Sequence, residues 1–264
     1  MIVAAESVTA LGEQARGAVL VAGSHGGVIA AYLAAVAGAR AVILNDAGVG
    51  KDAAGIAGLA YLDAIGMAAV TVAHGSARIG DGADALARGV VSHCNLAAAK
   101  LGVACGMPCR EAAALLERAP VPSATPPAYA EGRYLLSRSP GRPDVWGLDS
   151  VGKVAPADAG CILVVGSHGA LHGGRPESAL SVAALGAVFN DAGLGADRAG
   201  ITRLPVLAGR GVAAASVDCF SARIGDARSM WATGILSHVN RIAAGRGIRP
   251  GMPVTAFAAH LGAR

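Results

Sequence analysis

The 264-residue chain contains a long internal repeat. Residues 41–116 align without a gap over residues 186–261, and 35 of the 76 aligned positions are identical. Residues 17–26 align in the same way over 160–169, with seven of ten positions identical. Because self-similarity of this length marks a repeated structural unit, we interpret the chain as a tandem duplication. We expect the two halves to be related by a pseudo-two-fold axis.

The repeat predicts three parts in the chain. A first α/β repeat covers 1–117, a Pro-rich connector covers 118–148, and a second α/β repeat covers 149–264. Six prolines lie in the connector. Since proline fixes φ and removes an amide donor, this stretch is predicted to be extended.

Within the first repeat, short apolar runs alternate with helical patterns. The predicted strands cover 18–22, 41–44 and 68–73, and the predicted helices cover 28–37, a stretch from about Asp52, and Asp81 to about Leu101. Continuous apolar strands separated by helices are typical of a parallel sheet that is buried on both faces. The predicted fold of each half is therefore a βαβαβα unit with a mostly parallel sheet.

Charge and hydropathy exclude two classes of protein. The net charge of +4 is spread without a Lys/Arg run, which favours weak attraction for anions over nucleic-acid binding. Mean hydropathy is +0.50, and 17–39 has no charged residue over a length that could cross a bilayer. The polar turn at 24–27 interrupts that run, so we expect no membrane segment. The first residues lack the pattern of a signal peptide.

The cysteines indicate the compartment. There are five, an odd number, and most are not matched between the repeats, so a disulfide framework is not expected. A reducing cytoplasm fits this usage. The Ala-rich, apolar composition also favours association into a homo-oligomer.

Polar motifs recur in both halves at the ends of predicted strands, where doubly wound sheets bind their ligands. The first motif, Gly-Ser-His-Gly, covers 23–26 and 166–169. Glycine lets the backbone approach a ligand, and a following helix N-terminus favours an anion. Ser24, His25 and His168 are therefore candidate catalytic residues. The alternative is a tight turn capped by serine.

The second motif starts with Asn45-Asp46 and its copy Asn190-Asp191. Asp46 and Asp191 are candidates for a general base, a metal ligand or an anchor for a substrate hydroxyl or amine. Asn45 and Asn190 are candidate substrate-binding residues, with stabilisation of the turn as the alternative. Two later aspartates of this motif are predicted helix caps, namely Asp52 and Asp197.

The third motif, Ser-Ala-Arg-Ile-Gly-Asp, covers 76–81 and 221–226. Its candidate residues are Ser76, Arg78, Ser221 and Arg223. A hydroxyl, a guanidinium and a helix N-terminus together suit a carboxylate or phosphate. The alternative is an internal ion pair of Arg78 with Asp46 or Asp81.

The fourth motif, Ser-His-x-Asn, lies inside the third predicted helix, where His93 and His238 occupy equivalent positions. Two histidines and one carboxylate per half could hold a divalent metal. The candidate ligands are His25, Asp46 and His93 in the first half, and His168, Asp191 and His238 in the second.

Two aligned positions differ in chemistry between the halves. His74 aligns with Cys219, and Lys51 aligns with Ala196, all near predicted strand ends. A single site shared by both halves would then be asymmetric, with His74 and Cys219 as opposed acid and base. Divergence without a role in function is the alternative.

These motifs favour an enzyme that hydrolyses an amide-type bond in a small carboxylate-bearing metabolite. Arg78 and Arg223 would hold the carboxylate, with Lys51 and Ser221 nearby. Ser24 or Ser76 would be the nucleophile or an oxyanion donor, and His25 or His74 the base. Metal-activated water is a variant of this hypothesis.

Two further hypotheses stay open. A lyase or isomerase would move a proton between the halves, and a non-catalytic protein would clamp a small molecule. The sequence names no substrate.

Overall fold

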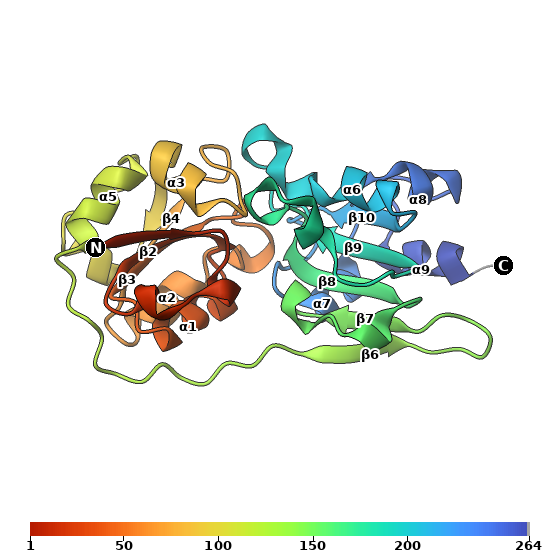
Figure 1. Ribbon diagram of the computed structural model, residues 1–264, viewed down its shortest axis with the longest axis horizontal. Helices are drawn as coiled ribbons and strands as arrows, with labels where there is room; N and C mark the ends of the chain where they lie inside the picture. The colour runs from red at the N-terminus through yellow and green to blue at the C-terminus, as the bar shows by residue number, and fades with distance from the viewer. Residues whose placement is uncertain (263–264) are drawn as a thin grey trace. The chain divides into compact units, whose positions relative to one another are not determined.

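The computed structural model describes residues 1–262 and consists of two compact α/β units (Figure 1). The first unit contains Met1–Val49 and Ala53–Ala130, and the second contains most of the chain from Glu131 onward. Each unit also contains a short segment from elsewhere in the sequence: Leu194–Ala199 belongs to the first and Gly50–Asp52 to the second. Both sheets are mixed and mostly parallel, as the sequence predicts.

The first unit has a five-stranded sheet of order β1-β2-β3-β4-β5, in which β5 alone is antiparallel to its neighbour. Its strands are β1 (Ile2–Ala5), β2 (Val19–His25), β3 (Ala41–Asn45), β4 (Ala68–Val72) and β5 (Val91–Cys94). Its α-helices are α1 (Val28–Val36), α2 (Gly58–Asp63), α3 (Gly82–Arg88), α4 (Leu96–Ala99) and α5 (Cys109–Leu116).

Helices cover both faces of this sheet (Figure 1). Successive residues of a strand point to opposite faces, so Val19 and Val21 of β2 pack with residues of α3 and α5. Leu20 and Ala22 pack with α1 and α2 on the other face. All four side chains are buried, which explains why the strands are continuously apolar.

The second unit has a six-stranded sheet of order β11-β10-β9-β8-β7-β6, whose two outer strands are antiparallel to their neighbours. Its strands are β6 (Arg133–Ser137), β7 (Val145–Leu148), β8 (Ile162–His168), β9 (Gly186–Asn190), β10 (Ala213–Val217) and β11 (Leu236–Val239). Its α-helices are α6 (Arg203–Gly209), α7 (Ala227–Thr233), α8 (Arg241–Gly245) and α9 (Val254–Gly262).

Short 3-10 helices occupy several connections. They cover Val8–Ala10, Glu13–Ala15, Lys51–Ala53, Val151–Lys153, Pro156–Asp158, His172–Gly174, Pro176–Ala179 and Ala196–Ile201. Over the described residues, none of the helices has both the length and the apolar character that crossing a membrane requires.

The predicted helix from Asp81 to Leu101 is wrong. Asp81 does cap a helix, since its side chain accepts a hydrogen bond from Asp84 N at 2.9 Å, but α3 ends at Arg88. A Cβ at Gly89 would lie 2.4 Å from the Ala85 carbonyl oxygen, so only glycine fits this helix end. The chain then turns into β5, which places His93 in a strand.

The helix predicted from Asp52 is also wrong. Lys51–Ala53 is a 3-10 segment in which Asp52 has a φ of 54°, and α2 begins only at Gly58. Asp52 and Asp197 do not act as helix caps; their carboxylates accept hydrogen bonds from arginines instead. The sequence around both aspartates resembles a helix start, but in the structure their carboxylates pair with arginines that are distant in the sequence.

Among the described residues of the second unit, no α-helix corresponds to α1. The residues after β8 form 3-10 turns that contain Pro176 and glycines with positive φ. Arg203, which aligns with Gly58, is fully buried and donates to the carbonyl oxygens of Ala170 and Ser178 at 2.9 and 2.6 Å. In the first unit a Cβ at Gly58 would lie 2.7 Å from the Cβ of Ala31 in α1. Helix α1 therefore packs against Gly58, whereas the second unit has the Arg203 side chain at the aligned position.

The predicted connector contains two strands that the proline pattern does not reveal. β6 and β7 form an antiparallel pair at the edge of the second sheet. Among the described residues, 118–132 form neither helix nor strand. The prolines at 140 and 143 lie in the turn between the strands, where no ladder amide is needed.

Candidate functional site

The segments that follow β2, β3 and β4 are hydrogen-bonded to one another. Gly26 N donates to the Asn45 carbonyl oxygen at 2.7 Å, and Asp46 N donates to the Val72 carbonyl oxygen at 2.9 Å. The polar residues of the first three motifs therefore lie at one end of a parallel sheet, where α/β proteins usually bind ligands.

Asp46 and His74 form a tight pair at this end. Asp46 Oδ1 accepts hydrogen bonds from the backbone amide of His74 at 2.8 Å and from its ring Nδ1 at 2.9 Å. Asp46 is buried, while the side chain of His74 is 36% exposed. A carboxylate at Nδ1 fixes the tautomer in which Nε2 is the basic nitrogen.

The pKa of Asp46 favours its charged form. Burial pushes this pKa upward, but the hydrogen bonds and charge of His74, together with the amide of Gly48 at 3.1 Å, outweigh burial and lower it below its usual value. Asp46 is therefore ionised at neutral pH and serves as a fixed acceptor for the imidazole.

The aligned pair of the second unit has different chemistry. Asp191 Oδ1 accepts the backbone amides of Cys219 and Gly193, each at 3.0 Å. Burial raises the pKa of the Cys219 thiol to about 12, and the charges of Asp191 and Asp218 add to this. Burial also raises the pKa of Asp191. Cys219 is thus a neutral thiol at neutral pH.

The loops after Asp46 and Asp191 have an unusual backbone. Among the described residues, eight that are not glycine have positive φ, and all lie within 47–53 or 192–198. Val49 (φ 61°), Leu194 (φ 63°) and Arg198 (φ 56°) have the largest side chains among them. Because the left-handed region costs about 1–2 kcal/mol per non-glycine residue, these loops hold strain next to both aspartates.

Part of each loop belongs to the other unit: Gly50–Asp52 lies in the second unit and Leu194–Ala199 in the first. In the first unit, Ala196 N donates to the carbonyl oxygen of His74 at 2.8 Å. In the second, Lys51 N donates to the carbonyl oxygen of Cys219 at 2.8 Å, and its ammonium donates to Thr233 Oγ1 at 2.8 Å. The Lys51 ammonium, which the sequence predicts to bind substrate, is thus hydrogen-bonded within the protein.

The serine hydroxyls are used by the backbone. Ser76 Oγ donates to the Ala73 carbonyl oxygen at 2.7 Å and accepts Val90 N at 2.9 Å. Ser221 makes the equivalent pair of bonds in the second unit. Ser24 is buried and accepts Val8 N at 3.0 Å. These bonds favour a structural role for the candidate nucleophiles Ser24 and Ser76.

The asparagines hold the turns, which is the alternative that the sequence left open. Asn45 is buried; its Oδ1 accepts Ala47 N at 2.9 Å and its amide donates to the Ala77 carbonyl oxygen at 3.2 Å. Asn190 makes the same two bonds in the second unit.

The arginines are paired with carboxylates. Arg78 contacts Asp84 at 3.0 Å, Asp197 at 3.3 Å and Asp81 at 3.4 Å. The ion pair of Arg78 with Asp81, which the sequence left open as an alternative, is thus present. Asp84 and Asp197 are two further partners.

Arg223 is paired in a similar way, with Asp226 at 2.8 Å and Asp52 at 3.0 Å. A substrate carboxylate at either arginine would have to replace one of these aspartates.

The two histidines of the first motif, His25 and His168, are buried. His25 is buried and its Nδ1 accepts Gly27 N at 3.1 Å; burial lowers its pKa to about 4, so it is neutral at pH 7. His168 Nδ1 accepts Ala170 N at 3.3 Å. His93 Nδ1 is buried without a partner among the described residues. By contrast, the side chain of His74 is 36% exposed.

The metal sets expected from the sequence are not brought together. Within residues 1–262, Asp191, Asp218 and Cys219 place three possible ligand atoms within 4.8 Å of one another, whereas the His-Asp-His set of neither half does so. His93 and His238 lie in strands rather than on a helix, which changes the direction of their side chains. A divalent metal as cofactor stays a prediction.

Asp218 is a residue that the sequence comparison missed. It lies directly after β10 and before Cys219, but it aligns with Ala73, so it is not a polar residue that both halves share. Its position directly after an apolar strand was the available signal.

Comparisons with known proteins assign no family to this chain: no family model matches it, and no curated protein or solved structure matches it significantly. The chemistry of the strand-end residues is therefore the ground for a functional proposal.

Proposed function

We propose that this protein is an enzyme that hydrolyses an amide-type bond in a small carboxylate-bearing metabolite, with His74 as general base and Asp46 as its positioning partner. The observation that carries the proposal is the pair of hydrogen bonds from His74 to the buried Asp46 carboxylate, beside an accessible imidazole. This arrangement keeps Nδ1 protonated against the carboxylate, which makes Nε2 the basic nitrogen of the ring.

The proposed reaction needs only a water molecule and the substrate. His74 Nε2 takes a proton from water as the water oxygen forms a bond to the amide carbon. His74 then returns the proton to the leaving nitrogen as the carbon–nitrogen bond breaks. Asp46 stays ionised throughout and stabilises the imidazolium that forms between the two steps.

The strained loop supports a functional role for this end of the sheet. Left-handed residues such as Ala47 and Val49 persist only where the surrounding structure enforces them, and such strain clusters at active sites. The loop starts directly after Asp46, and Gly48 N contributes to holding its carboxylate. A turn without a functional role would have a lower free energy with other backbone angles.

Arg78, which the sequence predicts to bind a substrate carboxylate, would supply recognition of that group. Arg78 is 45% exposed and its partner Asp197 is 55% exposed. Since exposed ion pairs contribute about 0–1 kcal/mol, a substrate carboxylate can replace Asp197 at little cost.

We also infer that the two units arose by tandem duplication. The parallel strands β1–β4 and β7–β10 follow the same order, and each set ends on an antiparallel strand. Asn45 and Asn190 make the same two hydrogen bonds at equivalent turns. The pseudo-two-fold relation between the halves stays a prediction.

The test is a hydrolysis assay with a panel of N-acyl amino acids and dicarboxylic acid monoamides, detecting released amine or ammonia. The variant His74→Ala should lose at least about a hundredfold in kcat, because general-base catalysis contributes 10²–10⁴-fold. His260→Ala, which removes a histidine from α9 of the second unit, is the control and should keep wild-type turnover. Equal turnover in both variants rules out His74 as the base.

Proton transfer at a carbon atom is the second candidate. It is favoured by the engagement of Ser24 and Ser76 with the backbone, since a base without a nucleophile also suits a lyase or isomerase. Incubation in deuterated water separates the two. Deuterium in the recovered substrate or product indicates proton transfer at carbon, whereas hydrolysis leaves the carbon positions unlabelled. Binding without turnover would favour a non-catalytic binding protein.

A further inference from the structure

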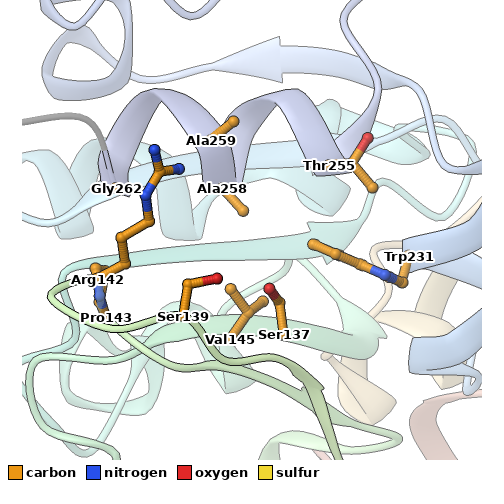
Figure 2. Close-up of a pocket in the computed structure, with 10 residues that line it drawn as sticks. All are labelled: Ser137, Ser139, Arg142, Pro143, Val145, Trp231, Thr255, Ala258, Ala259 and Gly262. Atoms are coloured by element: carbon orange, nitrogen blue, oxygen red, sulfur yellow. The ribbon is translucent and has the colours of Figure 1, made fainter.

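The second unit contains two adjoining cavities that lie away from every motif of the repeat. The smaller, of about 210 Å³, lies between the β6–β7 hairpin, Trp231 of α7 and helix α9 (Figure 2). The larger, of about 560 Å³, is bounded by the same hairpin, the end of α9 and Arg246. Arg142, Pro143 and Gly262 line both, so the two cavities adjoin at Arg142.

The polar groups that line these cavities have no protein partners among the described residues. Arg142 and Arg246 make no side-chain hydrogen bond or ion pair there, and no Asp or Glu is among the lining residues. The nearby carboxylate of Asp144 is already held by Arg138 at 2.7 and 2.9 Å. Within residues 1–262, no carboxylate therefore compensates the positive charge of these two guanidinium groups.

Hydroxyl groups lie beside the arginine. In Figure 2, Arg142 extends along the end of α9 while Ser137 and Ser139 lie on the opposite wall, on the strand side. Thr255 is at the other end of the α9 wall. None of these three hydroxyls donates to another described residue, in contrast to Ser24, Ser76 and Ser221. Each remains available as a donor to a ligand.

We propose that this pair of cavities binds a small anionic metabolite through Arg142 and Arg246. Guanidinium groups and hydroxyls are the donors that recognise phosphate and carboxylate oxygens, and Arg pairs with both in a forked geometry. Ala258 and the ring of Trp231 supply an apolar wall for the body of the ligand. The site is formed by the second unit alone and does not rest on the function proposed for His74.

The test is calorimetric titration of the full chain with two probes, pyrophosphate for the phosphate class and succinate for the carboxylate class. At least one probe should bind saturably. The double variant R142A/R246A should weaken that binding at least tenfold, because charged hydrogen bonds typically contribute tenfold or more each. The control R110A/R118A removes two positive charges from exposed positions of the first unit and should bind as the wild type does.

A second measurement places the probe at the cavity. The chain has two tryptophans, so the variant Trp146→Phe leaves Trp231 as the single fluorescent reporter. The probe that binds should change Trp231 emission with the same midpoint as in calorimetry. Selective binding of pyrophosphate or of succinate identifies the ligand class. The proposal is overturned if neither probe saturates at millimolar concentration, or if R142A/R246A binds as tightly as the control.

Discussion

The carboxylate of Asp46 accepts both the backbone amide and the ring nitrogen of His74, at 2.8 and 2.9 Å. Two hydrogen bonds from one residue to one oxygen fix the imidazole relative to its own main chain. The basic nitrogen of His74 is thereby directed by a buried group that does not itself need to contact substrate.

The first prediction concerns this relationship. Asp46→Asn removes the charge that holds the imidazole in one tautomer and stabilises its protonated form. We expect kcat to fall by about 10²–10⁴-fold with a smaller change in KM, measured by steady-state kinetics on any substrate from the panel. Glu13→Gln, an exposed carboxylate-to-amide change in the same unit, should leave both constants unchanged. Unchanged kcat in Asp46→Asn would remove Asp46 from the mechanism.

The second prediction concerns pH and His25. Burial lowers the pKa of His25 to about 4 in the folded protein, whereas the pKa of an unperturbed histidine is 6.5. Between these values the unfolded chain binds the proton and the folded protein does not, so stability is present above pH 6.5 and falls as pH drops toward 4. From pH 7 to 5 this amounts to about 2 kcal/mol.

Urea unfolding at pH 7 and pH 5 measures this difference. His25→Gln should lose about 2 kcal/mol less stability than the wild type on acidification, because glutamine does not titrate. His260→Gln, an exposed histidine, should keep the wild-type pH dependence. The same pH dependence in all three proteins would contradict a buried neutral His25.

The third prediction tests the backbone strain. Ala53 is exposed and has a φ of 54°, so Ala53→Gly should stabilise the protein by up to about 1 kcal/mol. Ala87 is exposed within α3, and Ala87→Gly should destabilise it by about 1 kcal/mol. Chemical denaturation of both variants gives the two signs. Destabilisation of similar size in both would show that Ala53 carries no strain.

The fourth prediction concerns the buried guanidinium of the second unit. Arg203 donates to three carbonyl oxygens and lies 5.1 Å from the ring centre of Phe189. Arg203→Ala leaves those carbonyls unpaired and opens a cavity, so a loss of about 3–5 kcal/mol is expected.

The control for Arg203 is Arg210→Ala. Arg210 also donates to two carbonyl oxygens of the 176–180 turn, but it is partly exposed, so water can replace it at a cost of about 1 kcal/mol. Thermal unfolding should therefore separate the two variants clearly. Equal losses would mean that burial of Arg203 is not what stabilises the turn.

The apolar strands, the Pro-rich stretch and the polar strand-end motifs were readable from the sequence, because each depends on local periodicity or on residue type. β2, β3 and β4 lie close to their predicted ranges for this reason. The sequence predicts helix over Val91–Cys94 because these residues follow a genuine helix start at Asp81, and only pairing with β4 makes them the strand β5.

The partners of the polar residues were decided by tertiary structure. The sequence places Arg78 near a strand end, but its pairing with Asp197, 119 residues away, arises only when distant segments meet. Asp46 and Asp191 occupy identical motifs, yet the pKa of one is lowered and that of the other is raised. Hydrogen bonds and charge from His74 help to outweigh burial in the first case, whereas the hydrogen bonds from Ser237, Gly193 and Cys219 do not outweigh it in the second. The sequence thus determined which residues reach the ends of the strands, and three-dimensional packing decided which of them keep a reactive group.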